Sequence, residues 1–439
     1  MMAETARATK TEAERALTHA APRAPHEPQW LTEARDAALR AFEAHGLPNR
    51  KVEAFHFTDL KALIRQPFPP ITADEWHNTR TDINGLSEKL QTLVLPLVNG
   101  EWNSVRIRVP TWVELDHLRA ALERDLEIAR LAFVESSTRS SAISEINLAQ
   151  ARDGVILRVE AGKHYALAIH HTAALTERGS VHVRHLIVLE EGASADVLEI
   201  FESEGAASLT TSGTVVHLAA GARLNHTKLV KGGASAINLG VTDARLGTGA
   251  DYRLYVQGAG ASLAREEVNA KLDDEGGHFS LGGMLLLSGE RHFDITARID
   301  HAAPRCTSNM TARAVLAGHS KGVVQGAVRV APHAQHTEAN QQIRGLLLSD
   351  RAEFDSKPEL EILADDVKCA HGAASGDLDH EAIFYLRSRG LPEDEARGLL
   401  IEAFLEQALA EVENETLRDY LRDEMRVQLK SMAGGQNAR

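Results

Sequence analysis

Residues 181–256 read VHVRHLIVLEEGASADVLEIFESEGAASLTTSGTVVHLAAGARLNHTKLVKGGASAINLGVTDARLGTGADYRLYV, in which short alternating runs of Val, Ile, Leu and Thr are separated by glycine turns. A Gly-Ala step recurs at Gly192, Gly221 and Gly249, which are 29 and 28 residues apart, and Gly276 follows 27 residues later. A period of about 28 residues accommodates one coil of strands with its corner turns. Because stacked coils bury a continuous apolar interior, the pattern predicts a β-helix, also called a β-solenoid.

Two other folds fit part of the same pattern. Strands at a spacing of roughly 8 to 12 residues with glycine turns also suit a β-sandwich or a cupin-type barrel. The strand-rich pattern begins near Gly154 and continues for about two hundred residues with almost no helical periodicity. The regular spacing of the Gly-Ala steps favours the solenoid over these alternatives without excluding them.

Changes in composition divide the chain into four parts. The first part is Ala-rich, charged and closed by three prolines, so we expect a mobile tail there that is transiently helical. The second contains an amphipathic helical pattern from Trp30 to His45 and then a mixture of strand and helix patterns. The predicted parts are a tail at 1–28, a helical and mixed α/β region at 29–150, the β-helix core at 151–376 and a C-terminal helical region at 377–439.

The C-terminal region carries clear helix boundaries. Asp379 suits the N-cap of a short helix that ends at Arg389, with Gly390 in the C′ position, and Pro392 suits the first position of the next helix. A further helix is predicted over Leu417–Met432. Such helices can either cap the open end of a solenoid or dock a partner, and the residues leave both possibilities open. The first long helix has a predicted apolar stripe of Ala396, Leu399, Leu400, Ala403, Phe404, Gln407 and Ala408.

Composition and charge narrow the functional classes. The chain has 48 Lys and Arg against 62 Asp and Glu, a net charge of −14, which disfavours nucleic acid as a partner. Two cysteines cannot build a disulfide framework, and such low usage fits a reducing compartment, so we expect a cytoplasmic protein. No apolar run approaches the roughly 20 residues of a membrane span, and the first residues lack the apolar segment of a signal peptide. We therefore expect no membrane insertion and no secretion.

Histidines and cysteines are the candidates for chemistry, because Walker A, G-x-S-x-G, C-x-x-C and H-E-x-x-H motifs are all absent from the sequence. Residues three apart on a strand point to opposite faces, which disfavours a metal shared by His182 and His185. We expect these residues, the pair His170 and His171, and the other clustered histidines to lie on the surface.

Cys369 and His371 are the strongest candidate pair. Residues i and i+2 of a strand face the same side, with side chains roughly 6 to 7 Å apart, so one thiol and one imidazole project together. Tight structural sites usually need four ligands. The chain has no second cysteine pair to complete such a set, so any tight site must take ligands from another chain. Cys369 taken alone also fits a buried, inert cysteine, which is what we expect of Cys306.

Three segments of the sequence carry a family resemblance. Residues 358–362 read PELEI, residues 365–373 read DDVKCAHGA and residues 383–390 read IFYLRSRG. Together they resemble the core signature of the SufB/SufD family of iron-sulfur cluster assembly scaffold subunits. The resemblance covers about residues 130–412. It is closer to the SufD branch than to SufB, because the chain lacks the additional cysteines expected of SufB.

This resemblance implies a right-handed parallel β-helix flanked by helical ends, a heterodimer with SufB, and a SufC ATPase bound through the C-terminal helices. It implies that Cys369 and His371 belong to a shared interface site for iron or a nascent cluster, with no cofactor held stably by the chain alone. The absence of a phosphate-binding loop agrees with a non-enzymatic subunit. A homodimer is a further expectation for the isolated chain. A carbohydrate-active β-helix enzyme and a homodimeric structural solenoid remain the alternatives.

Overall fold

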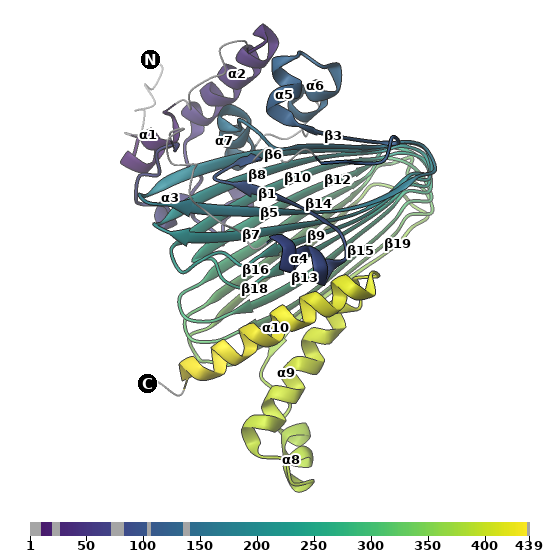
Figure 1. The fold of residues 1–439 in the computed structure, drawn as a ribbon. Helices are drawn as coiled ribbons and strands as arrows, with labels where there is room; N and C mark the ends of the chain where they lie inside the picture. Colours follow the sequence, from purple (N-terminus) through teal and green to yellow (C-terminus); the bar gives the residue numbers. More distant parts are fainter. Residues whose placement is uncertain (1–9, 20–26, 72–82, 103–106, 135–140, 437–439) are drawn as a thin grey trace, which may run out of the picture.

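The computed structural model describes residues 10–19, 27–71, 83–102, 107–134 and 141–436. Two long sheets face each other across a common interior in this part of the chain, one of ten strands and one of nine (Figure 1). The chain passes from one sheet to the other at each successive strand from β4 onward. This alternation confirms the predicted mainly β solenoid, with an N-terminal α/β region and C-terminal helices.

The ten-stranded sheet consists of β1 (Leu93–Val98), β2 (Glu101–Trp102), β5 (His164–Leu175), β7 (Ser194–Gly205), β9 (Arg223–Val230), β11 (Asp251–Gly258), β13 (His278–Leu287), β15 (Thr307–Leu316), β17 (Glu338–Leu347) and β19 (Lys368–Gly376). The nine-stranded sheet consists of β3 (Val113–His117), β4 (Val155–Val159), β6 (Gly179–Leu189), β8 (Ser208–Leu218), β10 (Ala236–Leu246), β12 (Leu263–Leu272), β14 (His292–His301), β16 (Lys321–Val330) and β18 (Glu353–Ile362).

The strand register reproduces the sequence period. Ser194 pairs with Arg223 and Arg223 with Asp251, so equivalent positions are 29 and 28 residues apart. From β4 to β19 the neighbouring strands run parallel, whereas β2 pairs antiparallel with β1 and β3 antiparallel with β4. Strand β1 pairs in parallel with β5, so the mixed region before the core contributes a strand to the solenoid itself.

The recurring glycines form one corner of the solenoid. Gly192, Gly221 and Gly249 have φ angles of 65°, 64° and 61°, in the left-handed region that favours glycine. The Gly192 N–H donates to the carbonyl of Ala220, and the Gly221 N–H donates to the carbonyl of Thr248, both at 2.8 Å. Each turn therefore hydrogen-bonds to the next coil, which explains why the glycine recurs once per coil.

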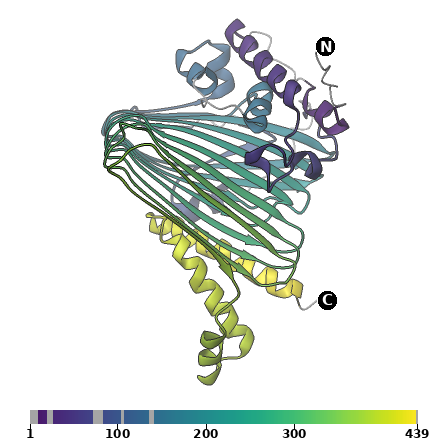
Figure 2. The same cartoon turned by 180° about the vertical axis from the view of Figure 1, so that it is seen from behind.

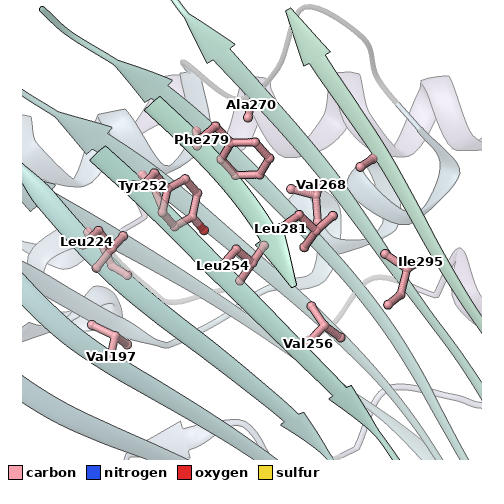
Figure 3. Packing of buried hydrophobic residues seen from close by; sticks show 14 of the residues in the cluster. Val197, Leu224, Tyr252, Leu254, Val256, Val268, Ala270, Phe279, Leu281 and Ile295 are labelled. Atoms are coloured by element: carbon pink, nitrogen blue, oxygen red, sulfur yellow. The ribbon is translucent and has the colours of Figure 1, made fainter. Parts of the chain in front are cut away.

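The interior of the solenoid is packed with side chains from alternate positions of both sheets. Leu224, Tyr252 and Phe279 follow one another in register across β9, β11 and β13, and all three are buried. The ring centroids of Tyr252 and Phe279 lie 5.4 Å apart. Figure 3 shows the two rings among the surrounding aliphatic side chains. These aligned apolar rows supply the main hydrophobic stabilisation of the fold.

Helices cover the outer faces of both sheets, on opposite sides of the solenoid (Figures 1 and 2). N-terminal helices pack against the nine-stranded sheet in clusters that include Leu186, Leu209 and Val215. The N-terminal helices are α1 (Glu12–Leu17), α2 (Gln29–His45), the 3₁₀ helix η1 (Glu53–Phe55), α3 (Leu60–Leu63), α5 (Leu118–Glu123), α6 (Glu127–Val134) and α7 (Ala142–Gln150). Because both faces of the sheets are covered, most strand residues are buried whichever way they point.

The outer face of the ten-stranded sheet is covered by α4 (Ile83–Leu90) together with the C-terminal helices α9 (Glu393–Leu409) and α10 (Glu415–Gln436). Helix α8 (His380–Ser388) and the adjoining end of α9 project away from the sheets (Figure 1). The Asp379 side chain accepts from the Glu381 and Ala382 N–H groups, which confirms the predicted N-cap. No helix in the described ranges is both long enough and apolar enough to cross a membrane.

The N-terminal segment 1–28, expected to be a tail with transient helix, contains a helix in its described part. This helix spans Glu12–Leu17, and its Ala13 and Leu17 are buried. A capping box at Thr11 stabilises this short helix, and Glu14 accepts from the Leu47 N–H at 3.0 Å.

The prediction of which α9 residues form the packed apolar stripe is partly wrong. Its buried residues are Ala396, Ile401, Leu405, Ala408 and Leu409. Leu399 is 50% exposed, and Ala403 and Gln407 are exposed as well. Apolar residues occur on almost every side of this helix, so the sequence pattern could not identify which side faces the sheet.

Candidate functional site

Cys369 and His371 lie on β19, the last strand of the ten-stranded sheet. In the β17–β19 register Cys369 is opposite Ala339 and His371 is opposite Gln341. Ala339 and Gln341 are buried in the solenoid interior, so both candidate side chains belong to the inward-facing row of β19. The structure thus places the thiol and the imidazole on one face, as the spacing predicts.

This end of the solenoid is open. Cys369 is half-buried against the interior, whereas His371 and the rest of β19 are exposed. Strand β18 forms the end of the other sheet and is also largely uncovered. No further coil follows in the described part of the chain, so each of these strands has one unpaired edge of backbone N–H and C=O groups.

The hydrogen bonds of β19 show which amides face the open edge. The Lys368 N–H donates to the Thr337 carbonyl at 2.9 Å, toward β17. Because amides alternate in direction along a strand, the N–H groups of Cys369, His371 and Ala373 point away from β17. The two candidate residues therefore lie where an added strand would pair.

Cys369 and His371 form an incomplete metal site. Within the described ranges, no third His, Cys, Asp or Glu joins them at a metal-binding distance. Burial raises the pKa of the Cys369 thiol, although a backbone hydrogen bond at Ala339 lowers it in part. The thiol is therefore protonated near neutral pH until a metal or a neighbouring group activates it. A tight site at this position requires ligands from a second chain.

Cys306 lies away from this end and is fully buried. Its thiol donates to the carbonyl of Asp274 at 3.3 Å and contacts that of Pro304 at 3.6 Å. Burial raises the pKa of this thiol. The expectation that Cys306 is a structural, unreactive cysteine agrees with these contacts.

The expectation that the paired histidines lie on the surface is wrong for two pairs. His170, His171, His182 and His185 are each at most 7% exposed. They are buried because helices or connecting segments cover the outer faces of the strands and neighbouring coils cover the inner faces. His185 faces the interior, whereas His182 points outward to Thr211. The two side chains therefore lie on opposite faces of the strand, as predicted.

One histidine of each pair contributes to a cluster that sequence reasoning missed. His171 on β5, His185 on β6 and Glu199 on β7 offer ligand atoms that all lie within 4.8 Å of one another in the solenoid interior. Strand alternation relates residues of a single strand, whereas these three residues come from three strands. A usable signal was available, namely ionisable residues at the inward positions of otherwise apolar strands.

A groove of about 770 Å³ runs along the outer face of the nine-stranded sheet and is lined by several carboxylates. Lys357 pairs with Glu53 and Glu359, and Arg329 pairs with Asp300 and Glu361. A glycosidase needs two carboxyl groups free to act as acid and as base or nucleophile. These paired carboxylates therefore do not support the carbohydrate-active alternative.

The projecting helices carry a separate set of exposed apolar side chains, here called the C-terminal apolar patch. Phe384 and Tyr385 on α8 are 74% and 56% exposed, and Leu399 on α9 is 50% exposed. Large apolar residues that remain exposed on packed helices indicate a contact surface for another molecule. This patch is separate from the buried face of α9 and α10.

Comparisons with known proteins agree with this architecture. The family model described as the SUF system FeS cluster assembly SufBD core domain matches residues 170–404, which is more than half of the chain. The model described as the SufBD protein N-terminal region matches residues 19–170. Together the two models span the N-terminal helices from α2 onward, the whole solenoid and most of α9.

Individual relatives are similar along most of their length. The chain is 28% identical to the iron-sulfur cluster assembly protein SufD of Escherichia coli, over 85% of this chain and 87% of that protein. It is 27% identical to a SufBD family protein of Synechocystis, over 89% of this chain and 90% of the relative. The chain is 26% identical to protein ABCI7 of Arabidopsis thaliana, described as chloroplastic, over 90% of this chain and 86% of that protein. The chain therefore belongs to the SufBD family of iron-sulfur cluster assembly proteins and is a homologue of SufD.

Proposed function

We propose that this chain is a non-enzymatic subunit of a complex that assembles iron-sulfur clusters, pairing with SufB and docking the SufC ATPase. The observation that carries the proposal is the open end of the solenoid, where Cys369 and His371 lie on an uncovered strand. Iron and sulfide are the substrates of this assembly, held transiently between the chains.

The open end supports pairing with SufB through strand addition. An unpaired strand edge is a template for pairing with another chain, and main-chain hydrogen bonds provide the affinity of such strand addition. Addition of a strand along β19 would bring its side chains beside Cys369 and His371. The partner chain would then supply the two further ligands that a four-coordinate site needs.

The C-terminal apolar patch supports docking of SufC. It lies on helices that project beyond the sheets and are joined to the strand that carries the candidate pair. No Walker A motif occurs in the sequence. ATP hydrolysis in the complex is therefore assigned to the partner, whose movements would reach β19 through α8.

Co-expression tests this proposal. The tagged chain is expressed with SufB and SufC of the same organism and purified anaerobically, and its co-purifying chains, iron and sulfide are measured. Capture of both partners, with cluster formed on the assembled complex, supports the proposal. A chain that purifies without SufB in its own host contradicts it.

Two further predictions concern the oligomeric state of the isolated chain and its location in the cell. Without SufB, the free edge of β19 is available to a second copy of the chain, so a homodimer is expected in isolation. A cytoplasmic location is expected from the low cysteine content.

A further inference from the structure

The solenoid interior contains a cluster of ionisable residues in the coil formed by β5 to β8. His171 is 5% exposed, and His185 and Glu199 are each 1% exposed. Four of their polar atoms have no hydrogen-bond partner, namely His171 Nδ1 and Nε2, His185 Nε2 and Glu199 Oε2. Buried polar atoms without partners are rare in folded proteins, and an ion or a water is a common reason for them.

The spacing of these atoms fits a metal ion. His171 Nε2 lies 3.5 Å and His185 Nε2 lies 3.8 Å from Glu199 Oε2. Ligands about 2.0 to 2.1 Å from a tetrahedral metal lie about 3.4 Å from one another, so both histidine-to-glutamate distances are close to this value, and the two histidine ligand atoms lie within 4.8 Å of each other. A cavity of about 10 Å³, roughly the size of one water, adjoins His171, although His185 and Glu199 do not line it.

The surroundings hold the ligands in place. Glu199 Oε1 accepts from Thr214 at 3.1 Å and from His226 at 2.8 Å, which leaves Oε2 directed to the two other histidines. His226 Nδ1 is bonded to the Tyr252 hydroxyl at 3.0 Å, and Phe201 stacks on His171 at 4.4 Å. Such hydrogen bonds and packing around the ligands orient them as in known metal sites.

The charge of the interior also favours a cation. Lys228 lies 3.2 Å from Glu266 and near Glu199, so one ammonium faces two buried carboxyl groups. Burial raises the pKa of Glu266, and the nearby Lys228 ammonium opposes this effect. Although Lys228 repels a metal ion, its ammonium is engaged by Glu266.

Coordination would alter one backbone contact. His185 Nδ1 accepts from the Val155 N–H at 3.0 Å, which places the ring proton on Nε2. Binding a metal through Nε2 requires the proton to move to Nδ1, so the Val155 amide loses this acceptor. The Val155 N–H and the Nδ1–H would then be two donors facing each other, so metal binding also requires a small shift of the His185 ring or of the Val155 backbone.

We propose that His171, His185 and Glu199 form a buried site for a divalent first-row metal ion inside the solenoid, distinct from the pair at its open end. Two histidines and one carboxylate with open positions suit ferrous iron, and the same donors bind Zn²⁺ and Co²⁺.

The test uses the full-length chain with Cys369→Ser and His371→Ala, which removes the pair at the open end. Co²⁺ is titrated into this protein, and its visible absorption bands and bound metal are measured. The site predicts about one equivalent of tightly bound Co²⁺, displaced by Fe²⁺ under anaerobic conditions. It also predicts at least about tenfold weaker binding in Glu199→Gln and in His171→Gln.

His164→Gln is the matched control, because His164 lies on the same strand as His171 but is exposed. This variant should bind as tightly as the parent protein. Circular dichroism shows which variants fold. If only one of Glu199→Gln and His171→Gln folds, that variant alone is enough to test the site. If the parent binds no Co²⁺ tightly, or if Glu199→Gln and His171→Gln bind it equally well, the cluster holds only water and the proposal is overturned.

Discussion

At the scale of single residues, His371 is the most informative position. It is exposed on β19 and in the inward row shared with Cys369, so its substitution removes a ligand and no core contact. A neutral imidazole binds metal near pH 7, whereas the Cys369 thiol first has to lose its proton. We expect His371→Ala to lower cluster formation in the co-expressed complex several-fold while the complex stays assembled.

The comparison variants sharpen this prediction. Cys369→Ser should have an equal or smaller effect, and Cys306→Ala should leave the cluster yield nearly unchanged because Cys306 is buried away from the open end. The measurement is iron and acid-labile sulfide per complex after anaerobic reconstitution. Unchanged yield in His371→Ala, with normal maturation of target proteins, would show that the pair is only structural.

Buried histidines make the stability of the fold sensitive to acid. Burial lowers the pKa of His301 to about 4 from its ordinary value of 6.5. As the pH falls below 6.5 the unfolded chain takes up the proton first, so the contribution of His301 to native stability is lost between about pH 6.5 and pH 4.

We therefore expect His301→Gln to reduce the slope of unfolding free energy against pH by up to about 1.4 kcal/mol per pH unit in this range. Urea unfolding at several pH values measures the slope. An unchanged slope in His301→Gln would contradict the burial argument.

At the scale of elements, α9 has two faces with different roles. Leu405 is fully buried against the ten-stranded sheet, so Leu405→Ala should lower the free energy of unfolding by about 2 to 5 kcal/mol. Removal of residues from 392 onward would uncover that sheet, which includes buried Leu198 and Leu286. A truncation is therefore a poor test of docking, and single substitutions in the C-terminal apolar patch are better.

Leu399→Asp should abolish or strongly weaken SufC capture while unfolding stays at the parent value, because the side chain is 50% exposed. The matched control is Val427→Asp on α10, where Val427 is 65% exposed but lies outside the patch. Pull-down with purified SufC provides the measurement. Equal capture by all three proteins would remove the patch from consideration as the docking surface.

Several elements could be predicted from sequence because local chemistry defines them. Gly192, Gly221 and Gly249 mark one corner of the solenoid, since their positive φ angles demand glycine once per coil. Asp379 marks the start of α8 by its side-chain cap. The pair Cys369 and His371 follows from strand alternation alone.

Other features depend on long-range packing and could not be predicted in this way. The buried side of α9 was misidentified because its apolar residues surround the helix. The meeting of His171, His185 and Glu199 depends on the register between three strands, which the local sequence does not encode. The short helix at Glu12–Leu17 is likewise stabilised by contacts from Leu47 and Lys61.

At the scale of the whole molecule, the solenoid has one exposed β end with a defined direction for its amides. Ala373→Pro removes an N–H that points to the open edge, whereas Ala374→Pro removes one that points to β17. We expect Ala373→Pro to reduce SufB co-purification at least tenfold with little loss of stability. Ala374→Pro should lower the unfolding temperature, and SufB capture by Ala373→Pro at the parent level would argue against strand addition.

Hydrogen exchange of β19 tests the central claim most directly. The amides of Cys369, His371 and Ala373 face no strand in the monomeric chain, so at a protein concentration that keeps the chain monomeric the peptide covering Lys368–Gly376 should contain fast-exchanging sites. Addition of purified SufB should slow hydrogen exchange at these sites by at least about tenfold. Exchange on the exposed surface of α2 should not change. Identical exchange with and without SufB, under conditions where the two proteins co-elute, would show that the open end of the solenoid is not the site of pairing.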